Sequence, residues 1–403
     1  MLTKICIRGY RALKALELDL PSGQPLVLIG ENATGKTSIL DALALLCATA
    51  SGQAGRAIRE RGGWQAVAWA GSSDPIELRA RFSEDFPAFE KDRGPVEYMV
   101  RFGNVRGIPT VLDEEVNVYQ KGLDQKPLLV LKGSRGMVLN RQTRDVEPVA
   151  PAPPDGIITN SLLAAITDEA RYPTPVHVRE ALQSIAFYAS FDLGAAQDGG
   201  GFGARQVEHT RRLGPTGRDL LNALHTLSQE SPRAWNALRA DLTAVFPWCD
   251  AMKFPPGPGR GVITMTWLDR RSGATLYLDD MSEGMRVYLA LLAALYAPDN
   301  PALLAFDEPE RSLHPRALQR LVKALELRAL TTPVVVATHS DRVLDHLEDP
   351  VAALRITRFT GASGVQLETL DRALLDAWRE EYTLSELRAR GMLEAPAGDE
   401  APP

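Results

Sequence analysis

The stretch GENATGKTS, residues 30–38, decides the fold, because it fits the phosphate-binding pattern G-x-x-x-x-G-K-[ST] at every fixed position. The apolar run PLVLIG (25–30) before it is typical of a buried strand, and residues 35–50 carry apolar side chains at helical spacing. Glycine lets successive backbone N–H groups turn inward toward a phosphate, and the helix N-terminus adds a positive field. The predicted phosphate-binding residues are Gly30, Glu31, Asn32, Ala33, Thr34, Gly35, Lys36, Thr37 and Ser38.

Two side chains of this loop suit a nucleoside triphosphate. Lys36 would neutralise the β and γ phosphate oxygens, and the hydroxyl of Thr37 would ligate Mg²⁺. We therefore expect ATP and Mg²⁺ as cofactors. The alternative, a glycine-rich turn with a surface lysine, does not explain why a buried strand and a helix flank the loop.

Acidic residues end a second apolar strand, PALLAFDEPE (301–310). Ligands bind at the carboxyl ends of strands in open α/β sheets, so Asp307 is placed to hold Mg²⁺ and Glu308 to polarise the attacking water as a general base. A solvated acidic loop is the alternative. It is the weaker one, because two adjacent carboxylates that end a buried strand are costly unless they are paired or bound to a metal.

A third apolar strand, PVVVATHSD (333–341), ends at Thr338, His339 and Ser340. A histidine at this edge would hydrogen-bond the γ-phosphate and respond to its loss. A lone histidine at a strand end is more often structural, but this one accompanies two other strand-end motifs. The predicted catalytic residues are therefore Lys36, Glu308 and His339.

The composition is that of an ordinary folded protein. The 403 residues are 45% hydrophobic and 24% charged, with a net charge of -6, which indicates neither a nucleic-acid binder nor a membrane binder. The three cysteines lack CxxC spacing, so they predict neither a disulfide framework nor a zinc site. The N-terminal stretch lacks the apolar core of a signal peptide, and no apolar run is long enough to cross a bilayer. We therefore expect a cytoplasmic protein with no membrane partner.

The order of elements predicts an α/β fold. Residues 75–140 are typical of short hairpins, the proline-dense residues 146–156 of a hinge or loop, and residues 160–186 and 215–246 of helices. From residue 282 helices and apolar strands alternate, which is typical of a parallel sheet covered by helices.

Together these motifs resemble those of the ABC-type ATPases, in the soluble branch that includes RecF, SMC heads and the overcoming-lysogenization-defect (OLD) ATPases. GENATGKTS looks like the Walker A of that branch, LLAFDEPERSLHP like its Walker B and D-loop, and VVVATHSD like its switch-histidine segment, over about residues 4–345. The resemblance also extends to short ATPases found in bacterial defence operons beside a separate effector.

The resemblance implies an ABC-type P-loop ATPase head with a mixed or parallel central sheet, a β-rich sub-region and an inserted helical sub-region. The expected divisions are an N-terminal part of the head with Walker A (1–150), a mainly helical insertion (151–255), a C-terminal part of the head (256–365), a helical segment (366–394) and a disordered tail (395–403).

In this family the position of MSEGMR, residues 281–286, is the signature motif, usually LSGGQ. Ser282 would cap the helix that follows, and Gly284 would let a phosphate approach the helix N-terminus. A capped core helix alone leaves the glycine unexplained, because most residues propagate a helix better. The resemblance implies that this phosphate is the γ-phosphate held by the other protomer. Glu283 and Met285 depart from the usual motif, so hydrolysis is expected to be slow or conditional.

Two further departures limit the resemblance. No Q-loop glutamine can be assigned, since Gln53, Gln65 and Gln183 lack a distinctive context. The segment between Lys36 and Ser282 is far longer than in transporter subunits, which argues against a transporter. The segment after His339 is too short for the nuclease-like Toprim domain of full OLD proteins, so any effector is expected to be another chain.

Three functions remain open. The first is an ATP-hydrolysing homodimer, with higher-order assembly possible, that closes head to tail on ATP and gates an effector or DNA in phage or plasmid defence. The second is a RecF-like DNA-repair ATPase that binds DNA directly through Arg205, Arg211, Arg212 and Arg218, against the alternative of a solvated charged face. The third is a slowly hydrolysing, nucleotide-gated scaffold, against which Glu308 argues. Residues 370–393 either dock a partner or, as we favour, pack onto their own domain.

Overall fold

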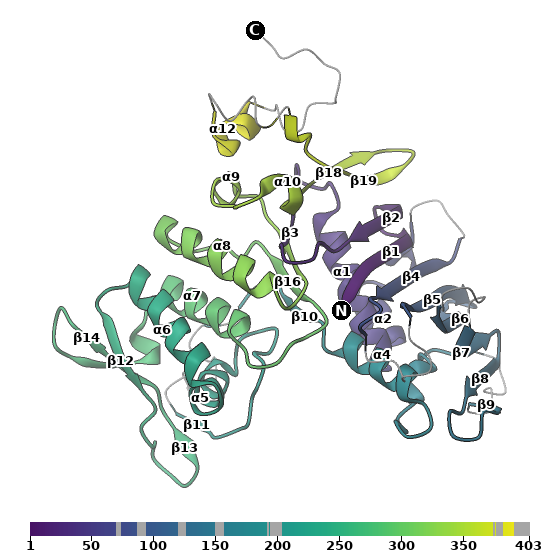
Figure 1. The fold of residues 1–403 in the computed structure, drawn as a ribbon, viewed down its shortest axis with the longest axis horizontal. Helices are drawn as coiled ribbons and strands as arrows, with labels where there is room; N and C mark the ends of the chain where they lie inside the picture. Colours follow the sequence, from purple (N-terminus) through teal and green to yellow (C-terminus); the bar gives the residue numbers. More distant parts are fainter. Residues whose placement is uncertain are drawn as a thin grey trace.

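The computed structural model describes residues 1–69, 74–86, 94–119, 126–149, 157–191, 193, 204–373, 375 and 382–390. Its centre is a six-stranded sheet with two lobes on either side and a C-terminal cap above (Figure 1). The strand order is β10 (Ala186–Tyr188), β16 (Leu304–Asp307), β17 (Val334–Ala337), β3 (Leu26–Ile29), β18 (Leu354–Thr360), β19 (Gly364–Glu368). The first five strands run parallel and β19 is antiparallel, so of the two expected arrangements, mixed or parallel, the central sheet is mixed.

Successive residues of the central strands point into two different cores, because side chains alternate across a strand. In β3, Val27 and Ile29 belong to one core, while Leu26 and Leu28 belong to the other. Strands β16 and β17 alternate in the same way. Burial on both faces explains why these strands are almost wholly apolar.

The first lobe is built on an eight-stranded antiparallel sheet. Its order is β2 (Leu13–Asp19), β1 (Leu2–Tyr10), β4 (Ile76–Phe82), β5 (Val96–Val105), β6 (Ile108–Val118), β7 (Lys126–Lys132), β8 (Arg135–Leu139), β9 (Val146–Pro148). The short hairpins predicted for residues 75–140 are therefore part of one sheet with the first two strands, because Ile5 of β1 pairs with both Leu18 and Ala80. The helices of this lobe are α1 (Lys36–Ala50), α2 (Ala54–Glu60), α3 (Trp64–Val67), α4 (Pro173–Gln183) and the 3₁₀ helix η2 (Leu163–Ala165).

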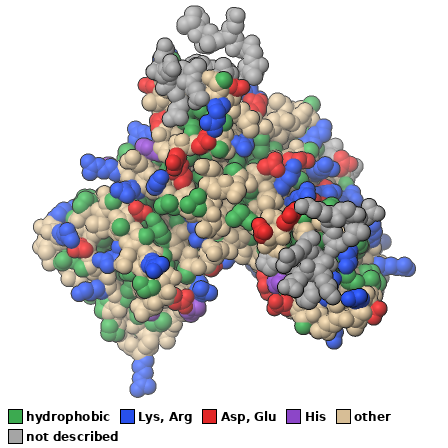
Figure 2. Space-filling model, in the orientation of Figure 1, with side chains coloured by type: hydrophobic (Ala, Val, Ile, Leu, Met, Phe, Trp, Pro, Cys, Tyr) green, Lys and Arg blue, Asp and Glu red, His purple; other side chains and the backbone are tan. Residues whose placement is uncertain are grey.

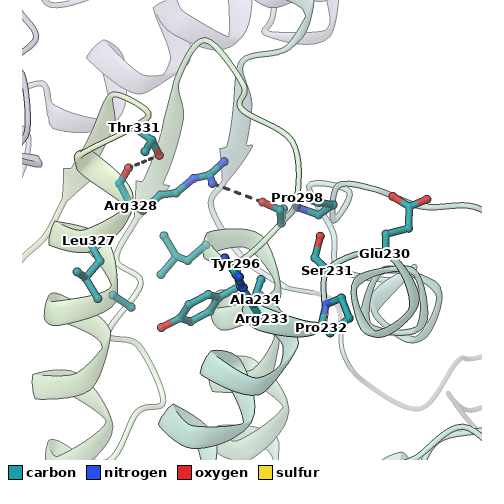
Figure 3. A pocket seen from close by; sticks show the side chains of 13 residues that line it. Glu230, Ser231, Pro232, Arg233, Ala234, Tyr296, Pro298, Leu327, Arg328 and Thr331 are labelled. Carbon is teal, nitrogen blue, oxygen red and sulfur yellow. Dashed lines mark hydrogen bonds between the residues drawn. The ribbon is translucent and has the colours of Figure 1, made fainter.

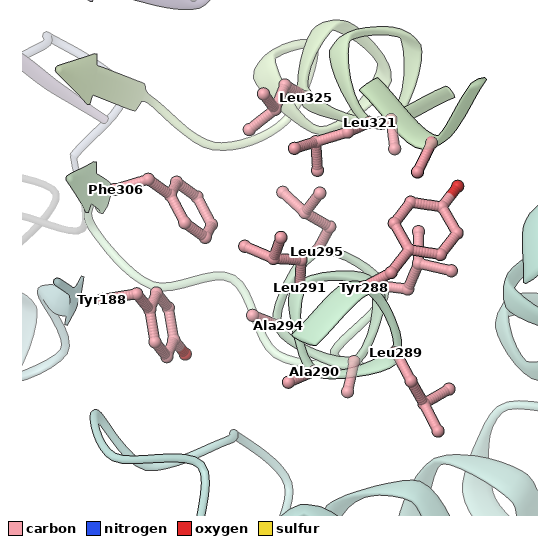
Figure 4. Packing of buried hydrophobic residues seen from close by; sticks show 14 of the residues in the cluster. Tyr188, Tyr288, Leu289, Ala290, Leu291, Ala294, Leu295, Phe306, Leu321 and Leu325 are labelled. Atoms are coloured by element: carbon pink, nitrogen blue, oxygen red, sulfur yellow. The ribbon is translucent and has the colours of Figure 1, made fainter. Parts of the chain in front are cut away.

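The second lobe covers the opposite face of the central sheet with helices and short strands. It comprises α5 (Leu220–Glu230), α6 (Pro232–Val245), α7 (Glu283–Leu295), α8 (Pro315–Ala329), the 3₁₀ helix η3 (Leu278–Asp280) and the strands β11 (Arg205–Gln206), β12 (Cys249–Lys253), β13 (Val262–Ile263), β14 (Thr266–Asp269) and β15 (Thr275–Tyr277). Figure 4 shows Leu291 and Leu295 of α7 directed at Leu321 of α8 and at Phe306 of the sheet. Each buried leucine contributes about 1.5–3 kcal/mol, so this contact fixes the α7–α8 pair on the sheet.

Residues 151–255, predicted as one helical insertion, divide between the two cores. The 3₁₀ helix η2 and α4 pack with α1 in the first lobe, β10 is an edge strand of the central sheet, and α5 packs on α7 in the second lobe. Within the predicted hinge, β9 occupies residues 146–148, and residues 150–156 lie outside the described part of the chain.

The C-terminal cap contains α9 (Asp341–Leu344), α10 (Pro350–Ala353) and α12 (Leu384–Ala389). Leu384 and Leu387 of α12 are buried, and α12 packs on α9, in agreement with the packing that we favoured for this segment. The predicted disordered tail, 395–403, lies outside the described residues. Among the described residues no helix is both long and apolar enough to cross a membrane.

Candidate nucleotide site

The phosphate loop follows β3 and is closed by the side chain of its own lysine. Lys36 is only 5% exposed, and its Nζ donates to the carbonyl oxygens of Gly30 (2.7 Å) and Glu31 (2.9 Å). Gly35 has φ of 94°, a left-handed conformation that favours glycine. The loop is thus already curled, with a buried ammonium at its centre, as a phosphate site requires.

Strands β18 and β19 press directly on this loop, which the sequence did not reveal. A β-carbon on Gly30 would lie 2.3 Å from the hydroxyl oxygen of Thr357, and one on Gly35 would lie 2.4 Å from a methyl of Val365. The Thr357 hydroxyl also donates to the carbonyl of Ile29 at 2.9 Å. Both glycines are therefore required by close packing as well as by backbone conformation. No local motif marks Thr357 or Val365.

The side chain of Thr37 lies close enough to the carboxylate of Asp307 to favour its charged form, so the two predicted Mg²⁺ ligands are neighbours at the end of β16. Burial, and then the neighbouring charge of Glu308, raise the pKa of Asp307, while Lys36 opposes the shift. No group of three or more His, Cys, Asp or Glu able to hold a metal occurs among the described residues. One hydroxyl and one carboxylate fit Mg²⁺, which is usually held by one or two carboxylates together with substrate phosphates and water.

Glu308, the predicted general base, adopts a strained backbone. Its φ is 49°, and its N–H donates to the carbonyl of Ala337 on the neighbouring strand at 2.8 Å. A non-glycine residue in this region costs about 1–3 kcal/mol and persists only where the surroundings impose it. The carboxylate lies 3.8 Å from Nε2 of His339, and both side chains are 38% exposed, which leaves them open to substrate.

His339, the predicted switch residue, is held in its neutral form by its surroundings. Burial is the main cause that lowers its pKa, followed by the charge of Lys36, while Glu308 opposes the shift. A neutral imidazole near pH 7 has both a donor and an acceptor nitrogen. His339 can therefore donate to a phosphate without carrying a permanent charge.

Glu310 is a third carboxylate at this edge, which the sequence interpretation passed over although it belongs to the acidic run DEPE. It is mostly buried, and the Thr338 hydroxyl donates to one of its oxygens at 2.5 Å. The same Thr338 oxygen accepts from the N–H of Ser340 at 2.9 Å. Glu310 thus connects the loop after β16 to the segment that carries His339. Burial raises its pKa, and its second oxygen is buried without a hydrogen bond.

The signature segment begins α7 as predicted, but a second physical reason requires glycine at position 284. Ser282 is the N-cap residue, and its side chain accepts from the N–H of Met285 at 3.4 Å. A β-carbon on Gly284 would lie 2.8 Å from the carbonyl oxygen of Ser312. The glycine that we attributed to an approaching phosphate is therefore also required by contact within the chain. Ser282 and Glu283 are exposed.

Helices α1 and α7, which follow the phosphate loop and the signature segment, lie on opposite sides of the central sheet. Helix α1 packs in the core of the first lobe, and α7 in the core of the second (Figure 1). The structure therefore unites Lys36, Thr37, Asp307, Glu308 and His339 at one edge, whereas Ser282 and Gly284 begin a helix on the other face.

The glutamines considered for a Q-loop remain unassigned. The amide of Gln183 donates to the carbonyl of Ala50 at 2.9 Å, which joins the ends of α4 and α1. Gln53 precedes α2 without a side-chain cap, and Gln65 is exposed on α3.

The arginines considered for DNA binding do not form one free stripe. Arg212 donates to Asp299 at 2.7 Å and to the carbonyl of Ser184 at 2.7 Å, so it joins two segments of the fold. Arg211 pairs with Glu230 at 3.2 Å. On the face shown in Figure 2, basic and acidic side chains are intermixed. The remaining two candidates are Arg205 in β11 and Arg218 before α5.

A pocket of about 720 Å³ in the second lobe is separate from this edge. It lies between α6, α7 and α8, and Figure 3 shows Tyr296, Leu327 and Arg328 around it. Arg328 donates to the carbonyls of Ala297 and Asp299, at 3.4 Å and 2.5 Å. None of the predicted nucleotide residues lines the pocket.

Comparison with known proteins gives the class. Residues 175–345 match the family described as "AAA domain, putative AbiEii toxin, Type IV TA system", and residues 1–96 match the "AAA ATPase domain" family. No curated protein matches the sequence.

Solved structures show the same fold. The chain is similar to an Smc head bound to the C-winged helix domain of ScpA, with a TM-score of 0.54 and 13% identity over 93% of this chain and 99% of that one. It is also similar to an Smc head with an extended coiled coil, bound to the C-terminal domain of ScpA derived from Pyrococcus furiosus. There the TM-score is 0.53, with 11% identity over 96% of this chain and 99% of that one. At such identities the likeness concerns the fold alone.

Both matched family descriptions are of ATPase or AAA domains, and together with the strand, loop and helix around Lys36 they support an ATPase. Its fold is that of the Smc heads, in agreement with the ABC-type head fold that the sequence motifs predicted.

Proposed function

We propose that the protein hydrolyses ATP with Mg²⁺ in a head-to-tail homodimer that gates a separate effector. The observation that carries this proposal is the separation of the exposed signature cap, Ser282, from the phosphate loop by the central sheet. A phosphate on the loop of one protomer then needs a second protomer to supply its signature segment. The two sites of such a dimer are equivalent, as two-fold symmetry demands.

Within each site the roles follow from the geometry. Lys36 binds the β and γ phosphates, Thr37 and Asp307 hold Mg²⁺, Glu308 activates water and His339 contacts the γ-phosphate. The proximity of Thr37 to Asp307 and of Glu308 to His339 supports these assignments.

A partner protein and a role in phage or plasmid defence complete the proposal. Two findings support it: one matched family description names a toxin of a type IV TA system, and the two Smc heads above are bound to domains of ScpA. Direct DNA binding is less favoured, because Arg211 and Arg212 are paired with carboxylates of the same chain.

The test is complementation between two inactive variants. Lys36→Ala disables the phosphate loop, and Ser282→Arg places a bulky cation at the exposed cap of α7. The mixed dimer has one intact site, formed by the loop of the Ser282→Arg chain and the signature of the Lys36→Ala chain. We expect mixing to restore up to about half of the wild-type turnover per dimer, since one of two equivalent sites is intact.

Two controls make the result decisive. Native mass spectrometry of differently tagged variants establishes that mixed dimers form. As a second control, Glu308→Gln replaces Lys36→Ala as the inactive partner, which again leaves one intact site in the mixed dimer but inactivates the other site through the general base. If mixed dimers form and turnover stays at the level of the separate variants, the shared site is wrong.

A further inference from the structure

Arg388, near the end of α12, reaches from the C-terminal segment into the nucleotide site. One guanidinium nitrogen donates to the carbonyl of Gly30 at 3.2 Å, and the other donates to the carbonyl of His339 at 3.4 Å and pairs with Asp341 at 2.9 Å. The side chain is only 10% exposed. Arg388 therefore bridges the first residue of the phosphate loop and the switch segment.

This position is built by the packing of α12. Leu384 and Leu387 are 3% and 0% exposed, and the N–H of Ser385 donates to Asp345 at 2.9 Å. Thr383 caps the helix in a reciprocal arrangement with Glu386. The guanidinium is therefore held at the site by an ordered helix.

The place that Arg388 occupies is where a phosphate enters. Strands β3 and β17 are adjacent and parallel, with Leu28 opposite Ala337, so the loops after them open at the same sheet edge. Ligands bind in the crevice at the carboxyl ends of such strands. Gly30 and His339 lie in these two loops, and Arg388 spans them.

The charges at this edge point to an anion. Lys36 and Arg388 both donate to the carbonyl oxygen of Gly30. Two cations at one neutral acceptor repel each other, so a further anion between them would be stabilising. A terminal phosphate between the loops could accept from both cations, and a guanidinium suits it because its planar fork matches phosphate oxygens.

We infer that Arg388 contacts the γ-phosphate of ATP bound in its own chain, so that the docking of α12 on the switch segment depends on the nucleotide. This inference rests on the proposed ATP site but needs neither the dimer nor hydrolysis. It makes the C-terminal segment part of the nucleotide sensor.

The experiment compares ATP and ADP affinities in the full chain, in a Glu308→Gln background that retains ATP. Arg388→Gln should weaken ATP binding about tenfold or more and ADP binding less than about twofold, because a charge-assisted contact to the γ-phosphate is lost. Arg388→Lys, which keeps the charge, should restore part of the preference for ATP. The matched control is Arg390→Gln, since Arg390 stacks on Tyr382 at 4.3 Å instead.

Hydrogen exchange of residues 384–390 gives the second readout. ATP, but not ADP, should slow exchange in the background protein and leave it unchanged after Arg388→Gln. Equal weakening of ATP and ADP, or no change in either, would show a purely structural bridge and overturn the inference while leaving the ATP site intact. If the background protein binds neither nucleotide, both proposals fail, whereas failure of the complementation test leaves this one standing.

Discussion

Gly284 in the first turn of α7 lies directly against Ser312 in the loop after β16: a β-carbon at position 284 would lie 2.8 Å from the carbonyl oxygen of Ser312. Ser312 lies in the loop that follows β16, the strand that ends at Asp307, and its own φ is 67°. The start of α7 is therefore held by the loop that follows the acidic strand end. A shift of that loop during hydrolysis would be felt at the signature segment of the same chain.

Gly284→Ala tests this contact. The added methyl must displace backbone, so we expect a loss of about 1–3 kcal/mol in the free energy of unfolding. Turnover should fall at least tenfold, because a small misplacement of a phosphate-binding group is costly, about a hundredfold for 1 Å. Urea denaturation and steady-state ATPase assays measure the two effects. Gly361→Ala is the matched control, since no heavy atom lies within 4 Å of its β-carbon; equal behaviour of the two variants would refute the argument.

The pair Thr37 and Asp307 predicts a specific magnesium dependence. Thr37→Val keeps the shape of the side chain but removes the hydroxyl, whereas Thr37→Ser keeps the hydroxyl. We expect the Mg²⁺ concentration for half-maximal turnover to rise about tenfold or more in Thr37→Val, a typical penalty for disturbing metal coordination. The rise should be small in Thr37→Ser. Titration of Mg²⁺ at fixed ATP measures it, and equal curves for both variants would exclude a hydroxyl ligand.

Glu310 predicts a pH dependence of stability. Burial raises its pKa in the folded protein above the value of about 4.3 expected for an unfolded chain. The protonated side chain of Glu310 therefore stabilises the folded protein fully below about pH 4.3, the pKa of the unfolded chain. This stabilisation is lost as the pH rises through the higher pKa of the folded protein. Glu310→Gln is neutral throughout, so its melting temperature should rise relative to wild type over the same interval. Scanning calorimetry at several pH values measures the difference, and a difference that does not change with pH would contradict the prediction.

The hydrogen bonds of the buried carboxylate of Glu114 predict that an amide at this position destabilises the fold. It is fully buried, and its carboxylate accepts from the hydroxyls of Tyr98 (2.7 Å) and Ser161 (2.5 Å) and from the N–H of Leu162 (2.5 Å). Burial raises its pKa despite these donors. Glu114→Gln replaces one accepting oxygen with an amide that faces a donor, so we expect a loss of about 1–3 kcal/mol.

Chemical denaturation measures this loss. Glu115→Gln is the control on the same strand, because Glu115 is only partly buried and interacts with the side chains of Asn117 and Lys132. A surface change of this kind costs less than about 0.5 kcal/mol. If Glu114→Gln is as mild as the control, the buried network does not depend on an ionised or fully accepting carboxyl.

The sequence predicted those parts of the site that depend on local order. The phosphate loop and the acidic strand end each follow an apolar strand, and a short continuous apolar run is a local signal of a strand buried on both faces. For the same reason the start of α7 at Ser282 was predictable from its cap.

The remaining parts depend on contacts that no local pattern encodes. Thr357 and Val365 touch the phosphate loop only because the central sheet places β18 and β19 beside β3. Arg388 is one of many arginines in the chain and lies on a short helix, and no motif in the neighbouring sequence marks it. The division of residues 151–255 between two cores escaped prediction because helical periodicity tells which face is buried and not which partner buries it.

The packing of β18 against the phosphate loop also constrains how the protein is made. Thr357 and its partner Ile29 are 328 residues apart in the chain. Because synthesis proceeds from the N-terminus, the ribosome completes the Walker A loop long before it makes the residues that enclose it. The nascent chain therefore carries an open phosphate loop through most of its translation. The nucleotide site is completed only near the end of synthesis.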